Sequence, residues 1–268
     1  MKHSWAALGI MISLSPFLPA SQARAAAAPA APGGPTYAEL RGEVLLDNAR
    51  VFVQKFMLQP RQSTGRHLHP GDQLLVFIKG GVLTSRATGR ATLWREGRVA
   101  WQSATDPADA GSTNTGTTPI EMICVTLKPV AAAQARTGTG AGTGTGAGTG
   151  TDAGPGAAAA REPKYRYLSY PNIPGEDLLE NDSVIVQRFT VNPGQWEGVH
   201  AHHPDMLFIH VKGGQWAVRS KHEPEHAYPD PSPDGEVGWE PTIPLSEGHE
   251  SGNVGKNPID LIWVTLKK

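Results

Sequence analysis

The sequence predicts an all-β protein in which two small antiparallel barrels are joined by a flexible, low-complexity linker. Three observations support this fold class. Short runs rich in Val, Ile, Phe and Thr alternate with Gly, Pro, Asn and Asp, which is typical of strands and turns. No segment beyond the N-terminal region shows a sustained helical period of apolar residues. The strand-rich pattern also occurs twice.

The internal repeat consists of three blocks that occur in the same order in both halves of the chain. The first two blocks are related by an offset of 133 residues and the third by 139, so the difference in length falls in the loops. The matched blocks are 45–56 with 178–189, 67–81 with 200–214, and 118–128 with 257–267. An ordered series of matches of this kind indicates a duplicated domain.

The segments outside the two copies have different compositions. Lys2 precedes a short apolar run that is interrupted by prolines and followed by small residues, which predicts a secretory signal peptide cut near Ala23 or Ala25. Gly, Thr and Ala repeats have too little to bury to fold, so the middle of the chain is expected to be a flexible linker. The predicted organisation is signal peptide 1–25, disordered tail 26–36, first domain 37–129, linker 130–162 and second domain 163–268.

Composition limits the partners and the compartment. The full chain has 24 Lys and Arg against 25 Asp and Glu, and signal removal leaves 22 basic residues without a basic cluster. We therefore expect no nucleic acid as a partner and, after signal cleavage, no membrane. The expected location is the periplasm or the exterior. Cys124 is the single cysteine, lies in an apolar run and is expected to be a buried, unreactive thiol.

Histidines open a long apolar run in the second copy. His200 and His202 are two residues apart, and side chains two apart in a strand share a face. The following residues Met206, Phe208 and His210 keep the same alternation, so both histidines are expected to point into the barrel. Imidazoles gathered in this way are typical metal ligands.

A third ligand has to come from another segment. His249, with Asn253 four residues later, is the candidate. His203 directly follows His202 and is therefore expected to face away from the barrel interior.

At these residues the chain resembles the cupin family, whose first motif is Gly, five residues, His-x-His, three residues, Glu, six residues and Gly. Residues matching the first motif, except that Met replaces Glu, are Gly194, His200, His202, Met206 and Gly213. The second motif is matched by His249 and Asn253, with Pro244 and Gly248 following it loosely. Because both halves carry the pattern, the resemblance implies a bicupin, with two double-stranded β-helix (jelly-roll) barrels that pair within a chain or, as a homodimer, between chains.

The departures from the family pattern bear on the metal. The glutamate ligand is replaced by Met206 in the second copy and by Gln73 in the first. The first copy keeps His67 and His69, but its counterpart of His249 is about Ala110. The resemblance therefore implies a three-histidine site for Fe, Zn, Cu, Ni or Mn in the second barrel. In the first barrel it implies a degenerate, hydrogen-bonded remnant.

Several further residues allow two interpretations. Met206 is either part of an apolar wall or a weak, soft ligand. His210 is expected to be a hydrogen-bonded core histidine, because it lies too far along the strand from Met206 to reach the same ion. Candidates for the lining of a small-molecule pocket are Trp196, Phe208, His210, Trp216 and Asn253.

Three functions remain open from the sequence. The first is a metal-dependent enzyme, since the resemblance implies oxygenase-like or isomerase-like chemistry on a small organic molecule. The second is a non-catalytic module that binds a small molecule or metal, and the third is a structural or partner-binding role without metal. No residue stands out as a general base. The sequence shows no phosphate-binding loop, nucleophile elbow or Cys pair, so nucleotide, serine-hydrolase and thiol-redox chemistry have no support.

Overall fold

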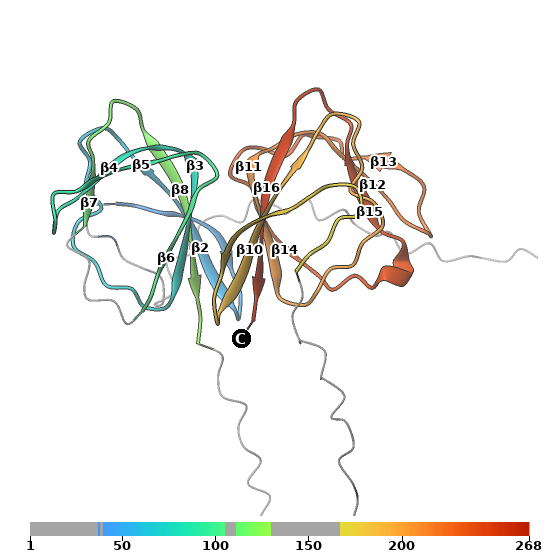
Figure 1. Cartoon of the computed structure of the whole chain (residues 1–268), viewed down its shortest axis with the longest axis horizontal. Coiled ribbons are helices and arrows are strands. Elements are labelled where there is room, and N and C mark those ends of the chain that lie inside the picture. The colour runs from blue at the N-terminus through green and yellow to red at the C-terminus, as the bar shows by residue number, and fades with distance from the viewer. Residues whose placement is uncertain (1–36, 38–39, 105–110, 130–166, 268) are drawn as a thin grey trace, which may run out of the picture. The chain divides into compact units, whose positions relative to one another are not determined.

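The computed structural model describes residues 37, 40–104, 111–129 and 167–267. The regular structure in these residues is β-strand apart from one short 3-10 helix, Leu245–Glu247 (Figure 1). The expected signal peptide 1–25, tail 26–36 and linker 130–162 lie outside the described residues. In the described part of the chain, no helix has the length and apolarity that a membrane crossing requires.

The first half of the chain forms one five-stranded and one three-stranded antiparallel sheet. The five-stranded sheet has the order β1-β2-β8-β3-β6 and the three-stranded sheet the order β5-β4-β7. The strands are β1 (Glu43–Asp47), β2 (Val51–Leu58), β3 (Gln73–Lys79), β4 (Gly81–Ser85), β5 (Ala91–Trp94), β6 (Val99–Gln102), β7 (Ser112–Asn114) and β8 (Ile120–Leu127).

The second half repeats this topology. Its sheets have the orders β14-β11-β16-β10-β9 and β13-β12-β15, which are the same connections with each strand number raised by eight. The strands are β9 (Glu176–Glu180), β10 (Val184–Val191), β11 (Met206–Lys212), β12 (Trp216–Arg219), β13 (His226–Ala227), β14 (Val237–Glu240), β15 (Glu250–Asn253) and β16 (Ile259–Leu266). The predicted fold of two jelly-roll barrels is confirmed.

The duplication extends to the strand register. Val51 pairs with Leu127 at one end of the β2–β8 ladder, and Val184 pairs with Leu266 at the equivalent end of β10–β16. These partners are related by the offsets of 133 and 139 that the sequence repeat shows. Register is set by the apolar pattern, because a shift of one residue would move every buried side chain to the other face.

Each five-stranded sheet buries both of its faces. On β11, Met206 belongs to the apolar cluster inside the second barrel, whereas Leu207 and Ile209 belong to a cluster that includes side chains from both halves. The first barrel has its own interior cluster around Phe56 and Phe77. This two-sided burial explains why the central strands are apolar over most of their length instead of alternating with polar residues.

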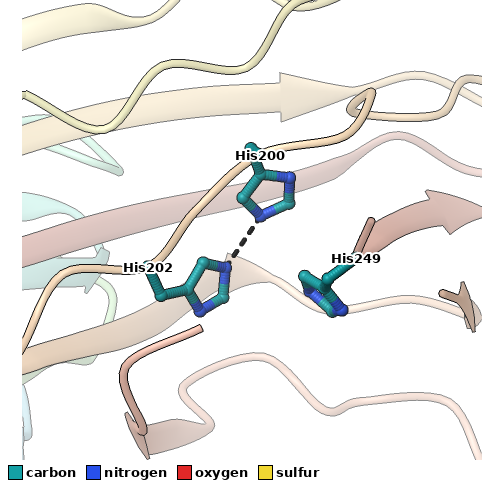
Figure 2. Close-up of side chains that lie close together, drawn as sticks. All are labelled: His200, His202 and His249. Atoms are coloured by element: carbon teal, nitrogen blue, oxygen red, sulfur yellow. Dashed lines mark hydrogen bonds between the residues drawn. The ribbon is translucent and has the colours of Figure 1, made fainter. Parts of the chain in front are cut away.

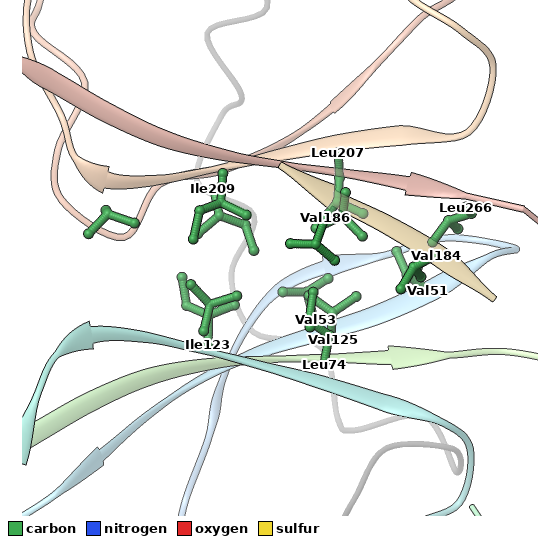
Figure 3. Close-up of a cluster of buried hydrophobic side chains, with 14 of the residues drawn as sticks. Val51, Val53, Leu74, Ile123, Val125, Val184, Val186, Leu207, Ile209 and Leu266 are labelled. Atoms are coloured by element: carbon green, nitrogen blue, oxygen red, sulfur yellow. The ribbon is translucent and has the colours of Figure 1, made fainter. Parts of the chain in front are cut away.

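The cluster shared by the two halves lies between their five-stranded sheets (Figure 3). Polar contacts at its edge are related by the same repeat. Arg50 forms an ion pair with Asp205, and the equivalent residues Ser183 and Asp72 are joined by a 3.3 Å hydrogen bond. The two barrels therefore pair within one chain through equivalent surfaces.

Candidate metal centre

Three histidines of the second barrel are brought together by backbone hydrogen bonds between distant segments. His200 and His202 lie in the connection from β10 to β11, and His249 directly precedes β15. The backbone N–H of His200 donates to the carbonyl of His249 (3.1 Å), and His202 exchanges two backbone hydrogen bonds with Ile243 (2.9 and 3.1 Å). These backbone hydrogen bonds fix the two segments that carry the three histidines relative to each other.

The three imidazoles converge on one point (Figure 2). One ring nitrogen from each of His200, His202 and His249 lies within 4.8 Å of the others, which is close enough for a single metal ion. His200 and His202 are 2% and 5% exposed, while His249 is only partly buried. His249 is therefore the most exposed of the three imidazoles.

The hydrogen bond of His200 determines its tautomer. Its Nδ1 lies 2.9 Å from the carbonyl oxygen of Gly198, and a carbonyl only accepts, so Nδ1 carries the hydrogen. The lone pair of His200 is consequently on Nε2, which points at His202. A ligand histidine normally has this arrangement, with one nitrogen donating to a protein acceptor and the other facing the ion.

His202 has a buried nitrogen without a hydrogen-bond partner. This atom is Nδ1, and the nearest charged group is Oε2 of Glu240 at 3.8 Å. If an ion took the lone pair of Nε2, the ring hydrogen would move to Nδ1, next to this carboxyl. The orphaned nitrogen therefore fits a metal site better than a purely structural histidine pair.

Burial keeps the three imidazoles neutral. Desolvation lowers the pKa of His200 to about 4 and that of His202 to about 3, and it also lowers the pKa of His249. Neutral imidazole is the form that binds metal, so near neutral pH protons compete little for these nitrogens.

One buried and one half-buried carboxyl group flank the histidines, and neither was identified from the sequence. Glu197 is 2% exposed, and its Oε2 lies 4.0 Å from Nε2 of His200. Burial raises the pKa of Glu197 to about 8 and that of Glu240 to about 7. Both groups thus hold or exchange a proton near neutral pH beside the imidazoles.

Two aromatic side chains, Tyr170 and Trp263, lie next to Glu197 and the histidines. The indole N–H of Trp263 donates to the hydroxyl oxygen of Tyr170 (2.7 Å), and the Tyr170 hydroxyl lies near the Glu197 carboxyl, where it offsets part of the rise in pKa that burial causes. Tyr170 also contacts the ring of His200 edge-on, with centroids 4.6 Å apart. These contacts tie the histidines and Glu197 to the apolar interior.

The remaining predicted site residues have structural contacts. The sulfur of the fully buried Met206 accepts the backbone N–H of His203 at 3.2 Å, which favours the apolar-wall interpretation of Met206. The side chain of Asn253 donates to the carbonyls of Val191 and Asn257, both at 2.8 Å. Asn253 therefore organises the turn after β15.

The residues expected to line a pocket make separate contacts and do not all meet in one place. His210 donates from Nδ1 to Glu236 (3.1 Å), and its Nε2 accepts the indole N–H of Trp216 (3.2 Å), as a core histidine would. Phe208 lies beside His210, with ring centroids 4.9 Å apart. Trp196 instead lies under the guanidinium of Arg219, 4.0 Å from its ring centroid.

In the first barrel the matching residues form a hydrogen-bonded chain. His67 contacts the carbonyl of Gly65 through Nδ1 (3.0 Å), and His69 Nδ1 lies 2.8 Å from the amide oxygen of Gln73. The Gln73 amide in turn donates to Thr126 (3.2 Å). Among the described residues of this barrel, no group of three His, Cys, Asp or Glu is close enough to hold an ion.

Comparison with solved structures gives the same fold. AerE from Microcystis aeruginosa is 12% identical over 88% of this chain and 98% of AerE, with a TM-score of 0.50. A cupin 2 conserved barrel domain protein from Leptotrichia buccalis is 10% identical over 87% of this chain and 91% of that protein, with a TM-score of 0.46. Salicylate 1,2-dioxygenase from Pseudaminobacter salicylatoxidans is 11% identical over 84% of this chain and 75% of the enzyme, with a TM-score of 0.44.

The repeated topology and the likeness to AerE together give the chain the architecture of two tandem jelly-roll barrels. At these sequence identities the likeness establishes the fold alone. No protein-family model matches the chain, and a search with its sequence finds no match among curated proteins.

Proposed function

We propose that the second barrel binds one divalent transition metal ion through His200, His202 and His249 and acts there on a small organic molecule. The single observation that carries this proposal is the convergence of three neutral imidazole nitrogens within 4.8 Å. Three imidazoles suit Zn, Cu, Fe or Ni, and a nearby carboxyl group widens the set to Mn.

The residues around the imidazoles support an enzyme rather than a storage site. A bound ion would supply Lewis acidity and open coordination positions for water or substrate. Burial raises the pKa of Glu240 to about 7, so this carboxyl group can hold a proton at the site near neutral pH. His249 is the most exposed of the three imidazoles, while Tyr170 packs against His200 and Trp263 against His202.

Elemental analysis of the full chain tests the metal proposal. We expect about one equivalent of a transition metal in the wild type, none in His249→Ala, and wild-type content in His222→Ala, whose side chain is exposed in another loop. Wild-type protein that stays metal-free after incubation with Fe, Zn, Cu, Ni or Mn would refute the proposal.

An oxygen-uptake assay tests the catalytic part. Catechols, diketones, thiols and flavonols are the substrate classes to compare, each with the metal-loaded wild type and with His249→Ala. Uptake that requires both the ion and His249 is the expected result. Metal-loaded protein without turnover on any class favours the non-catalytic binding module.

We also propose that the chain is exported to the periplasm or secreted, with residues 1–25 removed and 130–162 acting as a flexible linker. The support is the signal-like N-terminal composition and the Gly and Thr repeats of the sequence. N-terminal sequencing of the protein from its own host should begin just after Ala23 or Ala25. A retained Met1 would contradict cleavage.

A further inference from the structure

We propose that the carboxyl group of Glu197 is the fourth protein ligand of the ion and replaces the carboxylate that the family motif has lost at Met206. The inference rests on the proposed metal function and specifies its ligand set. It changes the charge of the site, since three imidazoles alone leave a divalent ion uncompensated, whereas a carboxylate neutralises half of its charge.

The distance between the Glu197 carboxyl and His200 supports this assignment. Metal bonds to His nitrogen and to carboxylate oxygen are about 2.0–2.2 Å long, so two ligand atoms on one ion lie roughly 3 to 4 Å apart. Oε2 of Glu197 is 4.0 Å from Nε2 of His200, the nitrogen that carries the lone pair. The carboxyl therefore lies beside the ligand nitrogen of His200 but outside the group of three converging imidazole nitrogens, so its side chain has to turn towards the ion to bind it. Glu240 instead lies on the Nδ1 side of His202.

The burial of Glu197 without a Lys or Arg partner among the described residues also supports the assignment. Glu197 is 2% exposed, and within the described part of the chain its recorded ion-pair contact is with His200 and not with a Lys or Arg. Buried carboxylates are normally paired with a cation or bound to a metal. The imidazole cluster, which Glu197 approaches through His200, is a site where such a cation fits.

The residues next to the Glu197 carboxyl group support the assignment as well. Trp263 donates to the hydroxyl oxygen of Tyr170, so the Tyr170 hydrogen is available for the Glu197 carboxyl. The backbone N–H of Glu197 donates to the carbonyl of Ser251 at 2.9 Å, which fixes the backbone from which the carboxyl group extends. A ligating carboxylate usually accepts a further hydrogen bond, and the Tyr170 hydroxyl is the donor next to Glu197.

The duplication of the domain is a further support for the assignment. The first barrel has Thr64 at the position equivalent to Glu197 and Ala110 at the position equivalent to His249. Its Thr64 hydroxyl is used locally and accepts the backbone N–H of Ser112 at 3.0 Å. The third histidine and the buried carboxyl thus occur together in one copy and are both missing from the other.

Cobalt(II) titration of the full chain, stripped of metal with a chelator, tests the assignment. We compare the wild type with Glu197→Gln and with Glu236→Gln, a matched change in the same barrel at the carboxyl that bonds to His210. Glu197→Gln should weaken Co²⁺ binding at least about tenfold and change the visible absorption of the bound ion. Glu236→Gln should stay within about twofold of the wild type.

The outcomes separate the inference from the proposed function. Tight Co²⁺ binding by Glu197→Gln with an unchanged spectrum overturns the ligand assignment and leaves the three-histidine site intact. Absence of Co²⁺ binding by the wild type overturns both. Crystals of the zinc-loaded wild type give a test that does not depend on the variant folding: a Zn–O distance to Glu197 of about 2.0–2.2 Å supports the assignment, and one beyond about 3 Å overturns it.

Discussion

The Nε2 atoms of His200 and His202 lie 2.7 Å apart inside the second barrel. Because Nδ1 of His200 donates to Gly198, its Nε2 is an acceptor, and His202 must supply the hydrogen between the two rings. This tautomer leaves Nδ1 of His202 with a lone pair and no hydrogen-bond partner. An ion would remove the shared hydrogen from between the rings and place it on Nδ1, where the Glu240 carboxyl can accept it.

The first prediction concerns Glu240. Glu240→Leu removes the acceptor for His202 Nδ1, so metal affinity should fall about 10–100-fold, as for other partners of ligand histidines. Glu240→Gln keeps an acceptor oxygen without the charge and should lose less. Isothermal titration with Zn²⁺ measures both. Equal affinities in the Leu variant and the wild type would show that the 3.8 Å approach has no functional consequence.

The second prediction concerns metal release in acid. Burial lowers the pKa of His200 to about 4 and that of His202 to about 3, from the ordinary 6.5. Protons therefore compete with the ion only when the pH falls well below 6.5, and half-release should occur below about pH 5. The visible absorption of bound Co²⁺ against pH measures this, and a midpoint between 6 and 7 would contradict the burial argument.

The third prediction concerns the stability of the metal-free protein. The pKa of Glu197 is raised from 4.5 to about 8, so the folded state binds more protons than the unfolded state between these values. Its contribution to stability is fully present below pH 4.5 and is lost as the pH rises towards 8.

The melting temperature of metal-free wild type should therefore fall between pH 6.5 and 8.5. The fall in melting temperature should be smaller in Glu197→Gln than in the wild type. In Glu236→Gln it should equal that of the wild type, because the pKa of Glu236 is lowered and not raised. If the melting temperature of Glu197→Gln follows that of the wild type at every pH, Glu197 does not bind a proton in this range.

The fourth prediction uses the equivalent asparagines of the two copies. Asn253 and Asn114 each donate to two carbonyls and accept one backbone N–H in the turn that follows β15 or β7. At about 1 kcal/mol for each hydrogen bond, Ala at either position should reduce the free energy of unfolding by roughly 2–4 kcal/mol. Denaturant titration should give similar losses, and a loss confined to Asn253 would mean that it has a role in the metal site instead.

The fifth prediction concerns the shared core. Leu74 and Leu207 are equivalent, fully buried residues that face each other's sheets in the cluster between the barrels. Each Leu→Ala substitution should reduce stability by about 2–5 kcal/mol, and unfolding should remain a single transition, since the cluster includes residues of both halves. Two separate calorimetric transitions in the wild type would contradict this coupling.

The barrels and the common direction of His200 and His202 were predictable because they depend on local pattern, whereas His249 was placed with them by the family resemblance. The repeat offsets of 133 and 139 correctly gave equivalent strands, and the structure pairs Val51 with Leu127 and Val184 with Leu266 in the same register. The two-residue spacing of His200 and His202 gave their common direction.

The carboxyl groups were not predictable because they depend on backbone turns and on long-range pairing. Glu197 would lie on the face opposite His200 in a regular strand, but Gly198 between them has a φ of +84°, which breaks the alternation. Glu240 reaches the site because β14 pairs with β11, where it lies opposite Met206. Neither relationship can be read from the spacing of residues in the sequence.

Pulsed electron paramagnetic resonance of the full chain loaded with one equivalent of Cu²⁺ shows directly how many imidazoles hold the ion. We expect nitrogen couplings from three imidazoles in the wild type and from two in His249→Ala. Identical couplings in the two proteins, or copper bound without imidazole in the wild type, would contradict the convergence of His200, His202 and His249 on one ion.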